Sequence, residues 1–323
     1  MRPAANSMSL YRICTLTLES NIEFPELPVV AHAFADYQFR LAPVRGTLQG
    51  QFAWYHHWTY PSGETWLSFA VHADGYLLRF PGLAHFVVAE ETVRCHPVAD
   101  VPELSIRHLF LDQVFPLVLS RKEPIVLHAS GVLTEHGAIG FVGLSGQGKS
   151  TLAVGFAQRG GSLLSDDFLV LRESAQGWSA LPTYSGVRLW PRAIPQLFEA
   201  TPEIAATAHY TEKLRIGAPE QIPFADAEAP IRSLYFLEVQ PEAQTTGPSI
   251  TPVPPQDALV RLIGSAFNID ITDKALLGRQ FAAFGRFITF VPCFELRYER
   301  DFSALPGLIR IIADHQKTVV GSR

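Results

Sequence analysis

The segment "AIGFVGLSGQGKSTLAVGFAQRGG", residues 138–161, decides the predicted fold of this 323-residue chain. Residues 143–150 satisfy the pattern G-x-x-x-x-G-K-[ST]. The apolar run before the pattern is typical of a buried strand, and the residues from Lys149 have helical spacing as far as Gly160-Gly161. A strand, a glycine-rich loop and a helix in this order predict an α/β core.

The residue types in this loop predict a binding site for a polyphosphate. Glycines let successive backbone N–H groups point inward, and the N-terminal end of the helix adds positive charge. We expect Lys149 to reach the β- and γ-phosphates of ATP, and Ser150 to offer its hydroxyl to Mg²⁺. A glycine-rich turn without a ligand is the alternative. The predicted nucleotide-binding residues are Gly143, Ser145, Gly146, Gln147, Gly148, Lys149, Ser150 and Thr151.

Two adjacent aspartates, Asp166 and Asp167, follow after one predicted helix and one predicted strand. A helix of about twelve residues rises roughly 18 Å, and a strand of about five residues climbs roughly 16 Å. Because these lengths nearly cancel, we expect the pair at the sheet edge where the phosphates bind. One carboxylate there can hold the metal while the other takes a proton from an attacking hydroxyl. A purely structural turn is the alternative.

The strand before the loop adds a histidine. If "VLHASGVLT" and "AIGFVG" pair across a turn at 135–137, opposite residue numbers sum to roughly 273. His128 then falls opposite about residue 145, inside the loop, where it would stabilise phosphate charge or orient a carboxylate. A buried, hydrogen-bonded core histidine is the alternative.

The rest of the chain divides near Pro102 into a β-rich part, 1–102, and an α/β part, 103–323. His56 and His57 are adjacent on a predicted strand, so they point to opposite faces and are not expected to share a metal. Pro-rich connections are expected at 217–230 and 240–256, the second as a mobile loop. Further elements are predicted as strands at 124–133, 162–171, 177–184, 231–239 and 293–299, helices at 102–120, 256–266, 274–284 and 302–314, and helix or loop at 191–217.

The composition indicates a globular protein and excludes several classes of function. Hydrophobic residues make up 47% and charged residues 18%, which allows a large buried core. A net charge of -5 without basic runs argues against nucleic-acid binding and a membrane anchor. The three scattered cysteines and the lack of a long apolar run favour a cytoplasmic location.

Taken together, "VLHASGV", "GLSGQGKSTLA" and "RGGSLLSDDF" resemble the catalytic domain of the HPr kinase/phosphorylase family, strongly over residues 125–170. The resemblance implies a mixed β-sheet with flanking helices, Asp166 as general base, Asp167 as magnesium ligand with Ser150, and His128 beside the reacting phosphate. The two aspartates could exchange these roles. The family also forms ring-like assemblies, so a homo-oligomer is an option.

The chain departs from that family after the aspartates. The family's Glu and Arg-Gly signature is replaced by "LPTYSGVRLWPRA", which offers Arg188 as a phosphate or substrate contact or as a surface ion-pairing residue. "GVRLWP" and "FELRYERDFSAL" resemble divergent relatives from biosynthetic gene clusters, some of which phosphorylate precursor peptides. We therefore expect an ATP- and Mg²⁺-dependent kinase acting on a serine of a protein or peptide. A small-molecule kinase and a nucleotide-binding regulatory protein are the alternatives.

Overall fold

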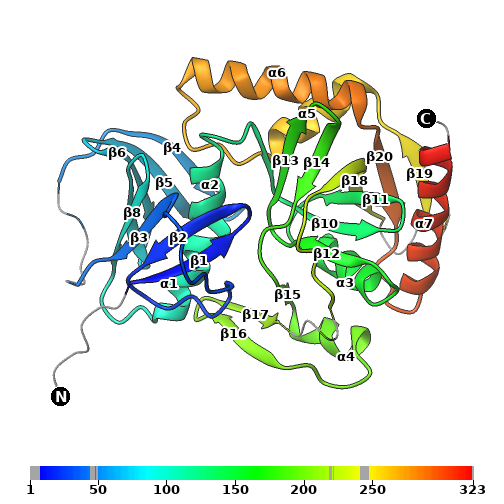
Figure 1. Cartoon of the computed structure of the whole chain (residues 1–323), viewed down its shortest axis with the longest axis horizontal. Helices are drawn as coiled ribbons and strands as arrows, with labels where there is room; N and C mark the ends of the chain where they lie inside the picture. Colours follow the sequence, from blue (N-terminus) through cyan, green and yellow to red (C-terminus); the bar gives the residue numbers. More distant parts are fainter. Residues whose placement is uncertain are drawn as a thin grey trace. The chain divides into compact units, whose positions relative to one another are not determined.

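The computed structural model describes residues 8–43, 48, 50–217, 220, 222–240 and 247–321. It is a mixed α/β protein with a β-rich N-terminal part, and its chain forms two compact units (Figure 1). The first unit contains the chain up to Arg121, together with Ala208–Thr211 and Asn268–Lys274. The second contains Lys122–Thr207, Glu212–Phe267 and the chain from Ala275 onward.

The first unit is built on a mixed β-sheet, with parallel and antiparallel strand pairs, followed by a helical segment. That segment consists of α1 (Glu103–Leu109), the π-helix η1 (Phe110–Val114) and α2 (Phe115–Leu119). Its Phe110 ring lies 4.6 Å from that of Phe39 on the sheet. Because these aromatic contacts join the helices to the sheet, the first unit extends past the boundary expected near Pro102. In the described residues the strand order is β1 (Ser9–Ile13), β2 (Leu16–Ser20), β3 (Tyr37–Leu41), β8 (Thr92–Pro97), β7 (Ala84–Val88), β6 (Gly75–Phe80), β5 (Thr65–His72), β4 (Trp54–Thr59).

The histidines of β4 have structural partners. His57 Nδ1 lies 2.9 Å from Ser68 Oγ, and the His56 ring packs on Phe69. No group of three or more His, Cys, Asp or Glu side chains that could hold a metal occurs in the described ranges. The three cysteines are buried. None of the helices in the part of the chain that the structure covers is long and apolar enough to cross a membrane.

The second unit contains a larger sheet with helices on both faces. Phe141 and Tyr235 face α3 (Lys149–Ala157) and α7 (Leu305–Gly321), while the next residues along the strands face α5 (Pro255–Ser265) and α6 (Lys274–Phe290). The described strands run in the order β12 (Ser162–Ser165), β10 (Ala129–Thr134), β11 (Gly137–Val142), β18 (Ala229–Val239), β14 (Gly177–Leu181), β13 (Leu169–Ser174), β9 (Ile125–Leu127), with β20 (Cys293–Tyr298) beside β18 and β19 (Ser249–Pro252) beside β20.

Two segments predicted as single strands are each interrupted where the candidate site lies. The strand expected over 124–133 stops at His128, because β9 pairs with β13 whereas β10 pairs with β11 and β12. The strand expected over 162–171 stops at Asp166, and Asp167 adopts a left-handed φ of 63°. Both breaks turn a side chain away from the regular alternation of a strand.

Most of the remaining elements agree with the sequence in kind but not in extent, and the segment 191–217 differs in kind. The segment 191–217, expected as helix or loop, also contains the hairpin β16 (Ile204–Ala208) and β17 (Thr211–Ile216). It begins with the 3₁₀-helix η2 (Pro191–Ala193) and α4 (Ile194–Leu197). Helices α6 and α7 continue beyond their predicted ends. Part of the predicted mobile loop, 241–246, lies outside the described residues.

Candidate functional site

The glycine-rich loop, residues 143–150, connects β11 to α3 and is fixed by Tyr298 of β20. Gly148 precedes the helix with a φ of 92°, which a residue with a side chain adopts only with strain. A Cβ on Gly148 would also lie 2.6 Å from the Tyr298 hydroxyl oxygen, which donates a hydrogen bond to the Gln147 carbonyl. Glycine is therefore required at this position by both conformation and space.

Asp166 lies at the end of β12 and is buried, with 2% of its surface exposed. Its Oδ1 accepts hydrogen bonds of 2.8 Å from the hydroxyls of Ser130 and Ser150. Its Oδ2 accepts a bond of 3.0 Å from the backbone N–H of Arg188. Burial, with the neighbouring charge of Asp167, raises the pKa of Asp166. The carboxylate is thus held by neutral donors that belong to three different segments.

Asp167 faces a different environment. Its Oδ2 accepts a hydrogen bond of 2.6 Å from Nε of Arg188, a buried guanidinium with 4% exposure. Burial would raise the pKa of Asp167, but the charges of Arg188 and Lys213 outweigh it and hold the pKa well below its usual value. Asp167 is therefore a carboxylate paired with cations, and it lines the cavity described below.

Lys149 and His128 form a connected pair beside the aspartates. Lys149 Nζ lies 3.1 Å from His128 Nε2 and donates to the carbonyl of Gly143 at 2.7 Å. His128 Nδ1 lies 2.9 Å from the backbone carbonyl of Asp167. Because Nε2 must accept from the ammonium group, Nδ1 carries the proton and donates to that carbonyl. Burial and Lys149 lower the pKa of His128 to about 4, and burial lowers the pKa of Lys149 to about 8.

The hairpin before the loop has a slightly different register from the predicted one. Ala129 pairs with Val142 and Thr134 with Gly137, so the turn contains only residues 135 and 136. Opposite residue numbers sum to 271 instead of roughly 273, and the turn, shorter by one residue because Gly137 begins β11, accounts for part of this difference. His128, one residue before β10, consequently lies beside the start of the loop instead of opposite residue 145.

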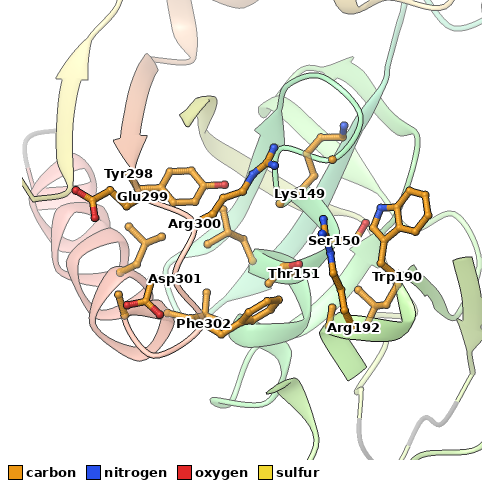
Figure 2. Close-up of a pocket in the computed structure, with 18 of the residues that line it drawn as sticks. Lys149, Ser150, Thr151, Trp190, Arg192, Tyr298, Glu299, Arg300, Asp301 and Phe302 are labelled. Carbon is orange, nitrogen blue, oxygen red and sulfur yellow. The ribbon is translucent and has the colours of Figure 1, made fainter. Parts of the chain in front are cut away.

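These groups open on a cavity of about 580 Å³. One wall follows β15 (Val187–Leu189) and η2, and the other is the segment 298–302 between β20 and α7; Figure 2 shows them on opposite sides of Lys149, Ser150 and Thr151. We call them the β15 wall and the β20 wall. The charged residues that line the cavity are Lys149, Asp167, Arg188, Arg192, Lys213, Glu299, Arg300 and Asp301.

The β20 wall is held by tight helix packing. A Cβ on Gly155 of α3 would lie 2.4 Å from Ile309 of α7, so the two helices approach closely at this glycine. Asp301 accepts hydrogen bonds from the N–H of Ser303 at 2.8 Å and from its hydroxyl at 2.6 Å, just before α7 begins. The position of α7 therefore fixes the 298–302 segment beside the loop.

The structure brings together most of the residues predicted from the sequence. The cavity is lined by His128, Ser145, Gly146, Gly148, Lys149, Ser150, Thr151 and Asp167. Gly143 and Gln147 do not line it; the Gln147 amide oxygen accepts the N–H of Leu144 at 2.5 Å. Asp166 lies behind the cavity surface. The Ser150 hydroxyl meets Asp166, whereas the expected metal site had paired Ser150 with Asp167.

Sequence reasoning missed the partners that come from distant segments. Ser130 lies two residues after His128 and bonds Asp166, but a serine in a strand carries no signal of such a role. Trp190, Arg192 and Arg300 line the cavity and lie in the quoted segments 181–193 and 294–305, but the sequence assigned them no role; Lys213 lies outside both segments. The sequence left Arg188 either as a phosphate or substrate contact or as a surface ion-pairing residue; in this structure it forms an ion pair with Asp167, but it is buried and does not lie on the surface.

The donor set fits a magnesium ion at one place. Ser150 Oγ and Asp166 Oδ1 are oxygen ligands already in contact, and Mg²⁺ in nucleotide sites is commonly held by one or two such groups with the substrate phosphates.

Comparisons with known proteins give little support. No family model matches the chain, and no curated protein matches it. Among solved structures, the Hpr(Ser) kinase/phosphatase from Coxiella burnetii aligns with a TM-score of 0.33 and 12% identity, over 60% of this chain and 97% of that one. The alignment indicates a remote relationship at most.

Proposed function

We propose that this chain is a kinase that transfers the γ-phosphoryl group of ATP to a hydroxyl, most simply a serine of a protein or peptide. One observation carries the proposal: the hydrogen bond between Ser150 and Asp166 lies beside Lys149, and Asp167 faces the same cavity. To bind a nucleotide with its metal ion, a phosphate-binding loop needs only one carboxylate, the one that holds the metal. The second carboxylate at the cavity surface supports transfer.

The geometry favours an exchange of the roles that the family resemblance implies for the two aspartates. In the proposed site Asp166 and Ser150 hold Mg²⁺, which neutralises phosphate charge when bound. Asp167 orients the acceptor hydroxyl and takes its proton as the new O–P bond forms and the bond to the ADP oxygen breaks. Arg188 must then loosen its ion pair with Asp167 or share it with the acceptor.

Lys149 and His128 complete the proposed site. Lys149 binds the β- and γ-phosphates in place of the loop carbonyls that it contacts in this structure. His128 is uncharged near neutral pH, since its pKa is lowered to about 4, and its Nε2 accepts from the ammonium group. It acts as a positioning residue that keeps Lys149 aimed at the loop.

The test is transfer from labelled ATP in the presence of Mg²⁺ to a panel of peptide, protein and small-molecule hydroxyls. The wild type should label an acceptor, and Asp167→Asn should still bind ATP by calorimetry while transfer falls by about 10²- to 10⁴-fold. Undiminished transfer by Asp167→Asn would remove its catalytic assignment. Binding of ATP with no transfer to any acceptor would favour the regulatory alternative, and labelling confined to small molecules would favour the small-molecule kinase.

A further inference from the structure

The β15 wall is fixed at the place where an acceptor must approach. Arg188 of β15 bonds Asp167 through its side chain and Asp166 through its backbone N–H. Trp190 and Arg192 follow within four residues and line the same cavity as Asp167. β17 pairs with β15, Leu214 opposite Leu189, which brings Lys213 to the same wall. This wall therefore belongs to the acceptor side of the proposed site.

The β15 wall carries an excess of positive charge. Arg192 is exposed, and within the described part of the chain it forms no ion pair with a carboxylate. Lys213 lies close enough to lower the pKa of Asp167. Among the acidic residues that line the cavity, only Asp167 lies on this side, and Arg188 already neutralises it.

The two walls differ in charge. On the β20 wall, Arg300 lies in sequence between the acidic residues Glu299 and Asp301. The carboxylate of Asp301 accepts a hydrogen bond from the N–H of Ser303. Figure 2 shows Arg192 and Arg300 reaching toward the loop from opposite sides. The phosphates of the nucleotide are already matched by Lys149 and the loop N–H groups. The charge of Arg192 on the β15 wall is thus available to the other substrate.

We propose that the acceptor carries negative charge next to its hydroxyl, as an acidic peptide whose serine lies beside a carboxylate. This inference rests on the proposed kinase function. Arg192 and Lys213 would bind the carboxylate, and Trp190, with 38% of its surface exposed, would pack on the peptide. The carboxylate can be a flanking Asp or Glu side chain or a free C-terminus next to the serine, since both present the same group to a guanidinium.

The experiment compares matched serine peptides in a phosphoryl-transfer assay with the full chain. One peptide has glutamates beside the serine, one has glutamines and one has lysines. A further pair ends in serine, either as the free acid or as the amide, to distinguish the two sources of the carboxylate. We expect kcat/KM for the glutamate peptide, or for the free acid, to exceed that of its neutral partner by about tenfold.

Charge reversal identifies the residue that binds the charged group of the peptide. Arg192→Glu should invert the order, so that the lysine peptide becomes the better acceptor. The matched control is Arg300→Glu on the β20 wall, which should leave the ratio of kcat/KM between acidic and neutral peptides as in the wild type. Because each ratio is measured within one variant, a general loss of activity does not affect it.

The outcomes separate this inference from the kinase proposal. Transfer with no preference for acidic peptides, or an Arg192→Glu variant that loses activity equally on all peptides, would overturn the inference and leave the kinase function standing. The second result would place Arg192 on the phosphate instead. No labelled peptide at all would overturn the inference, and the kinase proposal would then depend on the small-molecule acceptors.

Discussion

The region around Asp166 and the region around Asp167 are joined by one peptide bond but differ in exposure, in hydrogen-bond partners and in the direction of the pKa shift of the carboxyl group. Asp166 is buried among the hydroxyls of Ser130 and Ser150 and a backbone N–H, and its pKa is raised. Asp167 faces the cavity between Arg188 and Lys213, and its pKa is lowered. The left-handed φ of 63° at Asp167 separates them, because it sends the second side chain out of the strand.

Neighbouring carboxylates therefore need not have the same role. A carboxylate with neutral donors and a hydroxyl neighbour is suited to a metal, since its charge is not already matched. A carboxylate paired with movable cations at a cavity surface is suited to a substrate that competes for those cations.

Magnesium dependence should separate the two aspartates most strongly. Asp166→Asn should lower transfer on the order of 10³-fold and raise the Mg²⁺ concentration needed for half-maximal rate, because a metal ligand loses its charge. Asp167→Asn should lower the rate with an unchanged Mg²⁺ requirement. Rates measured over a series of Mg²⁺ concentrations check this. The reverse pattern would restore the roles implied by the family resemblance.

Removal of the Arg188 side chain should destabilise the fold. Arg188→Leu leaves the buried charge of Asp167 without its main partner and should lower the free energy of unfolding by about 3 kcal/mol, measured by urea denaturation. The double variant Arg188→Leu with Asp167→Asn should recover part of that loss. Arg192→Ala, on the same wall but exposed, is the control and should change stability by less than about 0.5 kcal/mol. An equal loss in the single and double variants would contradict an ion-pair contribution.

The neutral histidine should make stability depend on pH. The pKa of His128 is lowered to about 4 in the folded protein, so the unfolded chain, with an ordinary value near 6.5, takes up the proton first. Stability present above about pH 6.5 is then lost as the pH falls toward 4, by about 2 kcal/mol for a partly buried site. His128→Gln should flatten this part of the profile, measured by denaturation at several pH values. An unchanged slope would assign the loss to other groups.

Loss of one neutral donor should have the smallest effect. Ser130→Ala removes one of the hydrogen bonds to Asp166 but leaves those from Ser150 and the Arg188 N–H. We expect a loss of about 1 kcal/mol in unfolding free energy and a measurable but minor change in transfer rate. Ser174→Ala, whose hydroxyl bonds an exposed turn, is the control. A loss above about 3 kcal/mol for Ser130→Ala would show that Asp166 depends on that serine far more than the geometry indicates.

Local patterns were sufficient to predict the loop, the helix that follows it and the return of the aspartates to the same sheet edge. The pattern at 143–150 and the apolar run before it depend only on neighbouring residues, and both elements occur where expected. The lengths of the helix and the strand nearly cancel, as expected, so the aspartates lie beside the loop, although α3 and β12 are each shorter than the estimate. The assignment of the cavity to ATP stays a prediction.

The details that decide the roles of the side chains depended on distant pairing. The break at His128 arises because β9 and β10 join different neighbours, which no local pattern records. The β15 wall arises from the pairing of β15 with β17 and from bonds between Arg188 and both aspartates. The hairpin of β16 and β17 was missed because its short alternating runs follow a segment rich in Pro and Ala.

The left-handed backbone at Asp167 has a consequence for mutational scanning. Alanine at this position would lose the carboxylate. It would also have to adopt the left-handed conformation, which costs alanine about 1 kcal/mol. Asparagine tolerates the conformation and glycine adopts it freely. A saturation library read by protein abundance would therefore rank asparagine and glycine above alanine at this codon. An alanine scan alone would record backbone strain as lost chemistry.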